Sequence, residues 1–214
     1  AAPSGSLRLS AATDFGVNHI SNALGAFLHQ YPEINVNLVL NNRYVELISE
    51  GFDLAIRVGE LEDSTLRARK LTETNMKMVG SPEYFARNGK PKRIDDLNEH
   101  MLLHYSNQAS GNVWKLTSPT GEQRQIRTMG CLTVNDGQSL LTAASAGLGI
   151  AYLPSFLYHE KLELGLLEEA MPELPIERRG IYAVYPPGRY TQPKLRAFID
   201  FLVDHFKNKG PEEW

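Results

Sequence analysis

Cysteine is almost absent from this sequence. The 214 residues include one cysteine, Cys131, which excludes an intrachain disulfide. It also disfavours a disulfide-stapled secreted scaffold, because such domains use several cysteine pairs to stabilise a small core. We therefore expect a cytoplasmic location. We interpret Cys131 as a small apolar residue packed in a strand, with a redox role as the alternative.

The sequence also lacks a surplus of basic residues. Lysine and arginine number 22 against 25 aspartates and glutamates, which gives a formal charge of -3. Such a chain has no excess of cations for neutralising a phosphate backbone, so we expect weak DNA binding by this segment alone.

Long apolar runs are missing as well, and the first residues show no basic segment followed by an apolar one. We therefore expect no signal peptide in this stretch and no membrane association. The chain begins with Ala1 instead of methionine, which indicates a mature form or a piece excised from a longer protein.

Motifs for catalysis or cofactor binding are not found. The sequence has no phosphate-binding glycine loop, no histidine pair at metal-ligand spacing and no nucleophile elbow. The turn at Gly147–Gly149 lacks the third glycine and the following acid of a dinucleotide site. The six histidines are scattered over expected helix faces and loops. We expect no cofactor, no metal site and no enzymatic activity.

Strands and helices alternate in the first part of the chain. The expected elements are a strand at 7–11, a helix with an apolar stripe at 15–31 capped by Thr13 or Asp14, a strand at 34–40, a short helix at 44–51 and a strand at 52–58. This alternation is typical of an α/β fold with parallel strand pairing.

The second part is less regular. The extended segment 66–79 predicts a crossing into a second lobe near Thr74. The following expected elements are a helix capped by Ser81, a strand at 101–105, a turn at 118–121, a strand at 131–134, a helix capped by Asn135 or Asp136 and ended by Gly147, strands at 150–153 and 181–185, and an amphipathic helix from Pro193. We expect residues 207–214 to be frayed.

Two places combine a strand end, small or hydroxyl residues and a helix start, at 10–14 and at 133–136. Ligands of open α/β sheets bind at the carboxyl ends of strands, and amide groups at a helix start attract anions. Ordinary helix capping is the alternative interpretation. Asp14 and Asp136 also place a carboxylate in the field that an anion would occupy.

Several motifs resemble one protein family in order and spacing. They are residues 5–12 (GSLRLSAA), 27–38 (FLHQYPEINVNL), 53–59 (DLAIRVG), 66–71 (LRARKL), 81–84 (SPEY) and 146–154 (AGLGIAYLP). Together they resemble the regulatory domain of LysR-type transcriptional regulators, over nearly the whole chain.

The resemblance implies a two-lobed α/β fold similar to type 2 periplasmic binding proteins, with Rossmann-like lobes joined by a two-strand hinge. Lobe I would comprise residues 1–74 and 181–214, and lobe II residues 75–180. Family members carry a winged helix-turn-helix domain upstream, which we expect to be outside this chain and to bind the DNA. The resemblance also implies a homodimer, and a tetramer for the full-length protein.

In this family a small-molecule effector binds between the lobes. The positions that match the family's contacts are Ala12, Thr13, Asp14, Arg57, Val58, Gly59, Ser106, Val134, Asn135 and Asp136. Some family members have serine and threonine after the first strand, where this chain has Ala11 and Ala12. This difference argues against the usual carboxylate-binding chemistry at that loop. Helix amide groups and the Arg57 guanidinium could still offer donors, so the expected effector is a small polar or carboxylated metabolite. For Arg57, a structural ion pair that holds the third strand is the alternative.

Two other functions compete with a transcription regulator. An exported solute-binding protein of an uptake system would share the architecture, and so would an enzyme built on the same fold. The effector, the target promoters and the direction of regulation are not predicted by the sequence.

Overall fold

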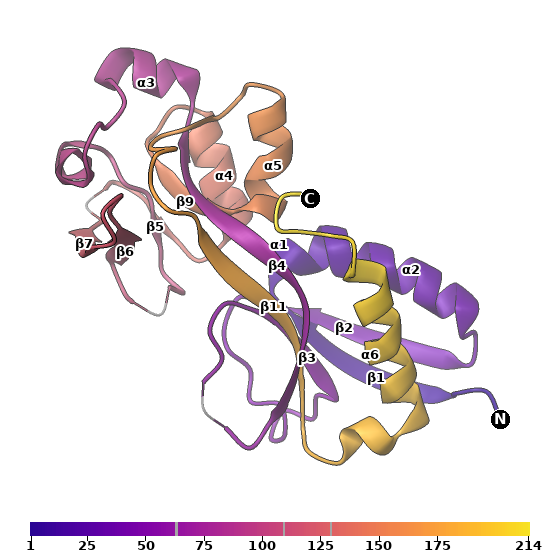
Figure 1. Ribbon diagram of the computed structural model, residues 1–214. Coiled ribbons are helices and arrows are strands. Elements are labelled where there is room, and N and C mark those ends of the chain that lie inside the picture. The colour runs from indigo at the N-terminus through magenta and orange to yellow at the C-terminus, as the bar shows by residue number, and fades with distance from the viewer. Residues whose placement is uncertain (63, 109, 129) are drawn as a thin grey trace. The chain divides into compact units, whose positions relative to one another are not determined.

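The computed structural model describes residues 1–62, 64–108, 110–128 and 130–214 of a mixed α/β protein (Figure 1). The chain divides into two compact units, Ala1–Thr74 with Arg179–Glu213 and Asn75–Arg178 with Trp214. The chain passes between them within two long strands, β4 (Arg67–Gly80) and β11 (Glu177–Tyr185). The first boundary falls at the expected Thr74, and the second lies two residues before the expected position.

The sheet of the first unit is built from β1 (Gly5–Ala11), β2 (Ile34–Leu40) and β3 (Leu54–Val58), with part of β11. β1 lies between β2 and β3 and is parallel to both, with Leu7 opposite Val36 and Leu9 opposite Leu54. β11 adds to β3 in the antiparallel direction. Leu7 and Leu9 are buried while Arg8 is exposed, as the two-residue period of a strand requires.

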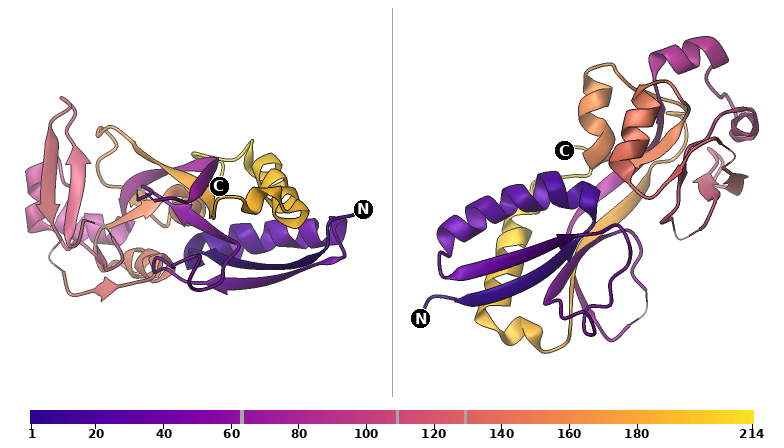
Figure 2. Two further views of the ribbon diagram at one scale, coloured as in Figure 1. Left: turned by 90° about the horizontal axis from the view of Figure 1, so that it is seen from below. Right: turned by 180° about the vertical axis from the view of Figure 1, so that it is seen from behind.

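Two helical segments cover one face of this sheet. The first runs through α1 (Thr13–Phe15), a π-helical turn (Gly16–Ile20) and α2 (Ser21–Gln30), and the second is α6 (Pro193–Phe206), preceded by a 3-10 turn (Arg189–Thr191). Figure 2 shows α2 and α6 lying together against the strands. Phe27 and Phe198 join them, with buried rings meeting edge to face at 4.9 Å.

The expected helix at 44–51 is wrong. This segment makes one hydrogen-bonded turn, in which Glu50 N–H donates to Glu46 O and Phe52 N–H donates to Leu47 O. Val45 and Leu47 are both buried, and a spacing of two residues does not match one helix face. They pack with Phe52, Ala55 and Val184 into a small separate core.

In the second unit, β4 pairs in antiparallel fashion with β9 (Ala151–Pro154) and β10 (Glu168–Glu169). The other strands are short: β5 (His104–Tyr105) is parallel to β8 (Thr133–Val134), and β6 (Val113–Thr117) forms a hairpin with β7 (Gln123–Arg127). The helices are α3 (Pro82–Asn88), a 3-10 segment (Ile94–Glu99), α4 (Gly137–Ser145) and α5 (Ser155–Glu163).

Several predictions for this unit need correction. The expected strands at 101–105 and 131–134 are each reduced to their last two residues, and α5 was not predicted. A Cβ atom at Gly130 would lie 2.5 Å from Leu102 O, so the two segments run too close together for a side chain there. Cys131 is exposed, so its expected role in core packing is wrong.

The expected fraying of residues 207–214 is also wrong. Thr72 Oγ1 donates a 2.5 Å hydrogen bond to the carbonyl oxygen of Lys209. Gly210 has a φ of +78°, and a Cβ atom there would clash with Glu73 O. At the end of the chain, the Trp214 ring meets the Phe156 ring edge to face at 6.2 Å. The tail is therefore fixed by specific contacts.

Candidate functional site

The structure gathers the expected site residues of the first unit at one end of its sheet. Ala11 of β1 lies opposite Ile56 of β3 in parallel register. Residues 12–14, which follow β1, and residues 57–59, at the end of β3, therefore lie at the same edge of the sheet. This is the edge at which ligands of open α/β sheets bind.

The helix start beside β1 differs from the prediction. Its N-cap residue is Ala12, and neither Thr13 nor Asp14 caps it with a side chain. Instead, the Thr13 N–H donates to Asn42 Oδ1 at 2.8 Å. Asn42 was not predicted, because a contact between residues 29 positions apart leaves no local pattern.

Arg57 makes structural contacts, although these contacts are not the ion pair that was considered as the alternative. Its guanidinium lies 3.6 Å from the centre of the Tyr44 ring, and Nη2 donates a 2.6 Å hydrogen bond to Val45 O. These contacts tie the loop after β2 to β3. Beyond Val58, Gly59 has a φ of +102°, and its N–H donates to Gly180 O at 2.9 Å.

The second unit brings together the ends of β5 and β8. Tyr105 lies opposite Val134, and Ser106 N–H donates to Val134 O at 2.9 Å. The next residue, Asn107, donates from Nδ2 to Asn135 O at 3.3 Å. Ser106, Val134 and Asn135 are therefore neighbours as expected, and Asn107 is an addition that the sequence did not reveal.

Asp136 caps α4, and it is one of the two capping residues that the sequence predicted. Its Oδ2 accepts hydrogen bonds from Ser139 N–H at 3.0 Å and from Ser139 Oγ at 2.8 Å. The carboxylate is half-buried and lies at the positive end of the helix dipole. Asn135, beside it, is exposed.

A chain of hydrogen bonds in the second unit contains two titratable groups whose pKa values are shifted by burial. The hydroxyl of the buried Tyr84 shares a hydrogen bond with His100 Nδ1 at 2.7 Å and accepts one from Met101 N–H at 3.1 Å. Burial raises the pKa of Tyr84 and lowers the pKa of His100, and Asp96 and Glu99 oppose the latter shift. None of these groups belongs to the expected site.

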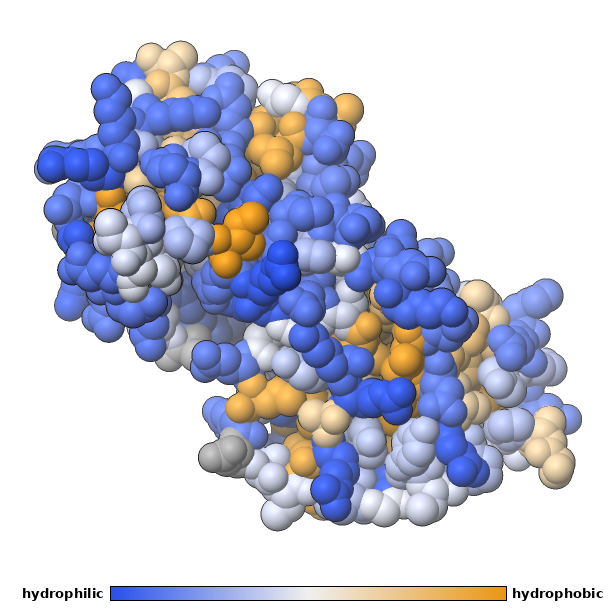
Figure 3. Space-filling view, viewed as in Figure 1, coloured by the Kyte–Doolittle hydropathy of each residue, from blue (hydrophilic) through white to orange (hydrophobic). Residues whose placement is uncertain are grey.

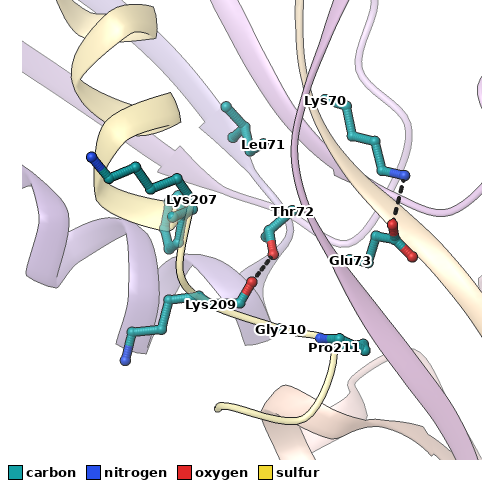
Figure 4. Close-up of a pocket in the computed structure, with 9 residues that line it drawn as sticks. Lys70, Leu71, Thr72, Glu73, Lys207, Lys209, Gly210 and Pro211 are labelled. Carbon is teal, nitrogen blue, oxygen red and sulfur yellow. Dashed lines mark hydrogen bonds and ion pairs between the residues drawn. The ribbon is translucent and has the colours of Figure 1, made fainter.

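Two cavities lie within the first unit. The larger, about 330 Å³, is lined by β4 and the C-terminal tail (Figure 4). The Lys207 and Lys209 ammonium groups point away from Thr72 in this view, and Lys70 pairs with Glu73 at 2.9 Å. The smaller cavity, about 180 Å³, includes Arg57. Neither cavity contains the expected site residues as a set.

The surface in Figure 3 is mainly hydrophilic, with separate apolar patches. Of the residues that the structure describes, Ile48 and Leu164 are the most exposed large apolar side chains. Within the described ranges, no three His, Cys, Asp or Glu side chains are grouped to hold a metal ion. The same residues contain no helix long and apolar enough to cross a bilayer.

Residues 1–207 match the family model described as the LysR substrate binding domain. An uncharacterized HTH-type transcriptional regulator of Haemophilus influenzae is 36% identical over 191 residues, which are 89% of this chain and 66% of the relative. This chain thus spans about two thirds of the length of such relatives.

Solved structures are similar over the same range. The CrgA regulatory domain of Neisseria meningitidis superposes with a TM-score of 0.84 at 30% identity, covering 95% of this chain and all of that one. The full-length virulence activator AphB of Vibrio cholerae also has a TM-score of 0.84 at 30% identity, covering 96% of this chain and 70% of that one. These matches show the two-lobed α/β fold that is similar to periplasmic binding proteins.

Proposed function

We propose, because this chain belongs to the LysR substrate-binding domain family, that it is the effector-binding domain of a bacterial transcription regulator. Binding of a small metabolite would control DNA binding or transcription through the oligomer. The observation that carries this proposal is the match of residues 1–207 to the family, supported by relatives that are transcriptional regulators.

The alternatives receive less support. The curated relatives are regulators, whereas an exported solute-binding protein would be expected to match uptake proteins. An enzymatic role has no support from these relatives. We propose that the protein is cytoplasmic. We also propose that the full-length protein binds DNA through a winged helix-turn-helix domain outside these 214 residues, because the relatives are HTH-type regulators of greater length. A homodimer, and a tetramer of the full-length protein, are part of the same proposal.

For the effector, we propose two sets of binding residues. The first set is Ala12, Thr13, Asp14, Arg57, Val58 and Gly59, and the second is Ser106, Val134, Asn135 and Asp136. The registers of β1 with β3 and of β5 with β8 support each set separately, since they place its members at neighbouring strand ends.

The test uses a ligand identified by a thermal-shift screen of metabolites. A ligand present at about a hundred times its Kd adds roughly 2.7 kcal/mol of stability, which such a screen detects readily. Thr13→Ala and Asn135→Ala should each weaken binding about 5- to 150-fold, as loss of a buried hydrogen bond worth about 1–3 kcal/mol implies.

Arg57→Lys is the contrasting variant, because it loses the stacking on Tyr44 and the fixed fork geometry of the guanidinium. It should lower the melting temperature more than Thr13→Ala or Asn135→Ala does. Calorimetric titration gives the Kd values and a thermal scan gives the stabilities. If both alanine variants bind as tightly as the parent chain, these residues do not form the site.

A further inference from the structure

We propose that the smaller cavity of the first unit binds a small aliphatic α-amino acid in its zwitterionic form. The cavity has a volume of about 180 Å³ and lies entirely within this unit. A water molecule takes up roughly 30 Å³ in the liquid, so the cavity has the volume of about six waters and suits a compact ligand. This inference goes beyond the effector-binding function and does not depend on it, although Arg57 is also one of the proposed effector-binding residues.

Arg57 provides the cationic group of the cavity. Its guanidinium lies 3.6 Å from the centre of the Tyr44 ring, and Nη2 donates to Val45 O at 2.6 Å. Stacking uses the flat face of a guanidinium, whereas its five N–H donors lie in the plane and point outward from its edges. Within the described part of the chain, Val45 O is the only acceptor that this group contacts. The other donors suit a carboxylate, which a guanidinium binds through charge-assisted hydrogen bonds.

Glu62 provides the anionic group. Its side chain is exposed, and it makes no ion pair with the other residues that the structure describes. Among the described residues that line the cavity, Arg57 and Glu62 are the only charged ones. Glu62 repels a ligand that carries only a carboxylate, and Arg57 repels one that carries only an ammonium group, because like charges repel. A zwitterion pairs its carboxylate with Arg57 and its ammonium group with Glu62.

An apolar wall lies beside these two charges. Leu61 and Leu66 line the cavity and are partly buried against a small core that includes the buried Val184. The Tyr44 ring also lines it and keeps 48% of its surface exposed. An aliphatic side chain placed against this wall removes apolar surface from water on both sides. Sites for small molecules typically combine such a wall with a few placed polar groups.

Internal hydrogen bonds hold the two loops that carry these residues. In the loop after β2, Arg43 pairs with Glu50 at 2.7 Å, and Glu46 N–H donates to Glu50 Oε2 at 2.7 Å. In the loop after β3, Leu66 N–H donates to Ser64 Oγ at 3.1 Å. A site that is already formed loses less conformational entropy on binding than one whose loops must first become ordered.

Calorimetric titration of the whole 214-residue chain with matched compounds tests the ligand class. L-Leucine is compared with 4-methylpentanoate, which lacks the amino group, and with 3-methylbutylamine, which lacks the carboxylate. L-Serine tests the need for an aliphatic side chain. Each compound is added up to about 10 mM, since ligands this small bind weakly. We expect L-leucine to bind about tenfold more tightly than each of the other three, or better.

Glu62→Gln tests the position of the site, since it removes the charge with little change of shape. L-Leucine should bind about fivefold more weakly to this variant. The affinity for 4-methylpentanoate should stay the same or rise, because that compound has no ammonium group to lose its partner. Glu60→Gln is the matched control, since Glu60 is exposed in the same loop and does not line the cavity. It should leave both affinities unchanged.

The possible failures are distinct from those of the proposed function. The inference is overturned if L-leucine does not bind at about 10 mM, or if 4-methylpentanoate or 3-methylbutylamine binds as tightly. Equal L-leucine affinity in Glu62→Gln and Glu60→Gln also overturns it. None of these results contradicts an effector domain, whose ligand should depend on Thr13 and Asn135. Thr13→Ala should leave L-leucine affinity unchanged, and a clear loss there would assign L-leucine to the proposed effector residues instead of this cavity.

Discussion

Gly210 determines how the C-terminal tail meets β4. Its φ of +78° lies in the left-handed region, and a Cβ atom would clash with Glu73 O and lie 2.7 Å from Thr72 Oγ1. No side chain other than hydrogen fits between these backbone segments. A glycine next to a proline in a charged tail is typical of a frayed end, so this contact was not predictable from the local sequence.

Gly210→Ala should therefore destabilise the protein through steric overlap. Gly165→Ala is the matched control, because Gly165 has a φ of +71° and nothing within 4 Å of its Cβ position. Both variants share the backbone strain, and the overlap should cost Gly210→Ala about 1–3 kcal/mol more. Urea unfolding measures the difference, and equal losses of free energy would show that the tail adjusts without cost.

Whether a site residue could be predicted depends on how far apart in the sequence its contact partners lie. Asp136 was predicted as a cap because capping depends on residues three positions apart. Asn42, Asn107 and the Tyr44 partner of Arg57 were not predicted, because they act through tertiary contacts. The ten proposed binding residues themselves stay a prediction until a ligand is found.

α6 carries much of the apolar packing of the first unit. Leu195, Phe198, Ile199 and Leu202 are fully buried, at the spacing of one helix face. The Phe27 ring contacts both Phe198 at 4.9 Å and Phe201 at 5.4 Å, yet only Phe198 is completely buried. Phe198 and Phe201 thus both contact the Phe27 ring, but they differ in how far their side chains are exposed to solvent.

Phe198→Ala should reduce the free energy of unfolding by about 3–5 kcal/mol, because it leaves a cavity in the core. Phe201→Ala, which removes a half-exposed ring, should cost clearly less. Chemical denaturation of both variants measures the two losses. A larger loss for Phe201 would mean that the ring contact, and not burial, determines the contribution of α6.

Elements that begin at a recognisable residue, such as proline or a turn residue, and have a regular apolar pattern beside it could be predicted from the sequence. The helices that begin at Pro82 and Pro193, and the turn between β6 and β7, combine both features. α5 was missed because it buries only Ser155, Leu157 and Tyr158 near its start, which leaves no apolar stripe along its length. The false helix at 44–51 arose from treating Tyr44, Leu47 and Ile48 as one apolar helix face, whereas Tyr44 and Ile48 are exposed and only Leu47 is buried.

Two histidines make the stability of the whole molecule depend on pH. Burial lowers the pKa of His100 below its ordinary value of 6.5, against the opposing charges of Asp96 and Glu99. Burial also lowers the pKa of His205, assisted by Lys209 and opposed by Asp204. For each group the unfolded chain then binds its proton at a higher pH than the folded chain, so acid favours unfolding.

The free energy of unfolding should consequently fall as the pH drops from 7.5 through 6.5 to 5.5. The loss stops growing once the pH is below the folded pKa values. His100→Gln should reduce this dependence, since glutamine can still accept the Tyr84 hydroxyl without titrating. Urea unfolding at the three pH values provides the measurement, and the prediction fails if the parent and the variant lose stability equally.

At the scale of the molecule, the sequence predicted the fold class better than the strand pairing. Alternating strands and helices indicated parallel pairing, which holds for β1 with β2 and β3. The antiparallel additions of β9 and β10 to β4, and of β11 to β3, join segments far apart in the sequence. Their pairing depends on long-range packing, which no local period encodes.

The division of the chain also has a consequence for its synthesis. The first unit needs residues 179–213 to complete its sheet and to cover Phe27, while the second unit is almost continuous in sequence. On the ribosome, residues 1–74 of this chain emerge before the whole second unit, so its first strands wait for residues 179–213 before their sheet is complete. The second unit can fold earlier, and residues 1–74 are the part that needs protection from aggregation until residues 179–213 have been synthesised.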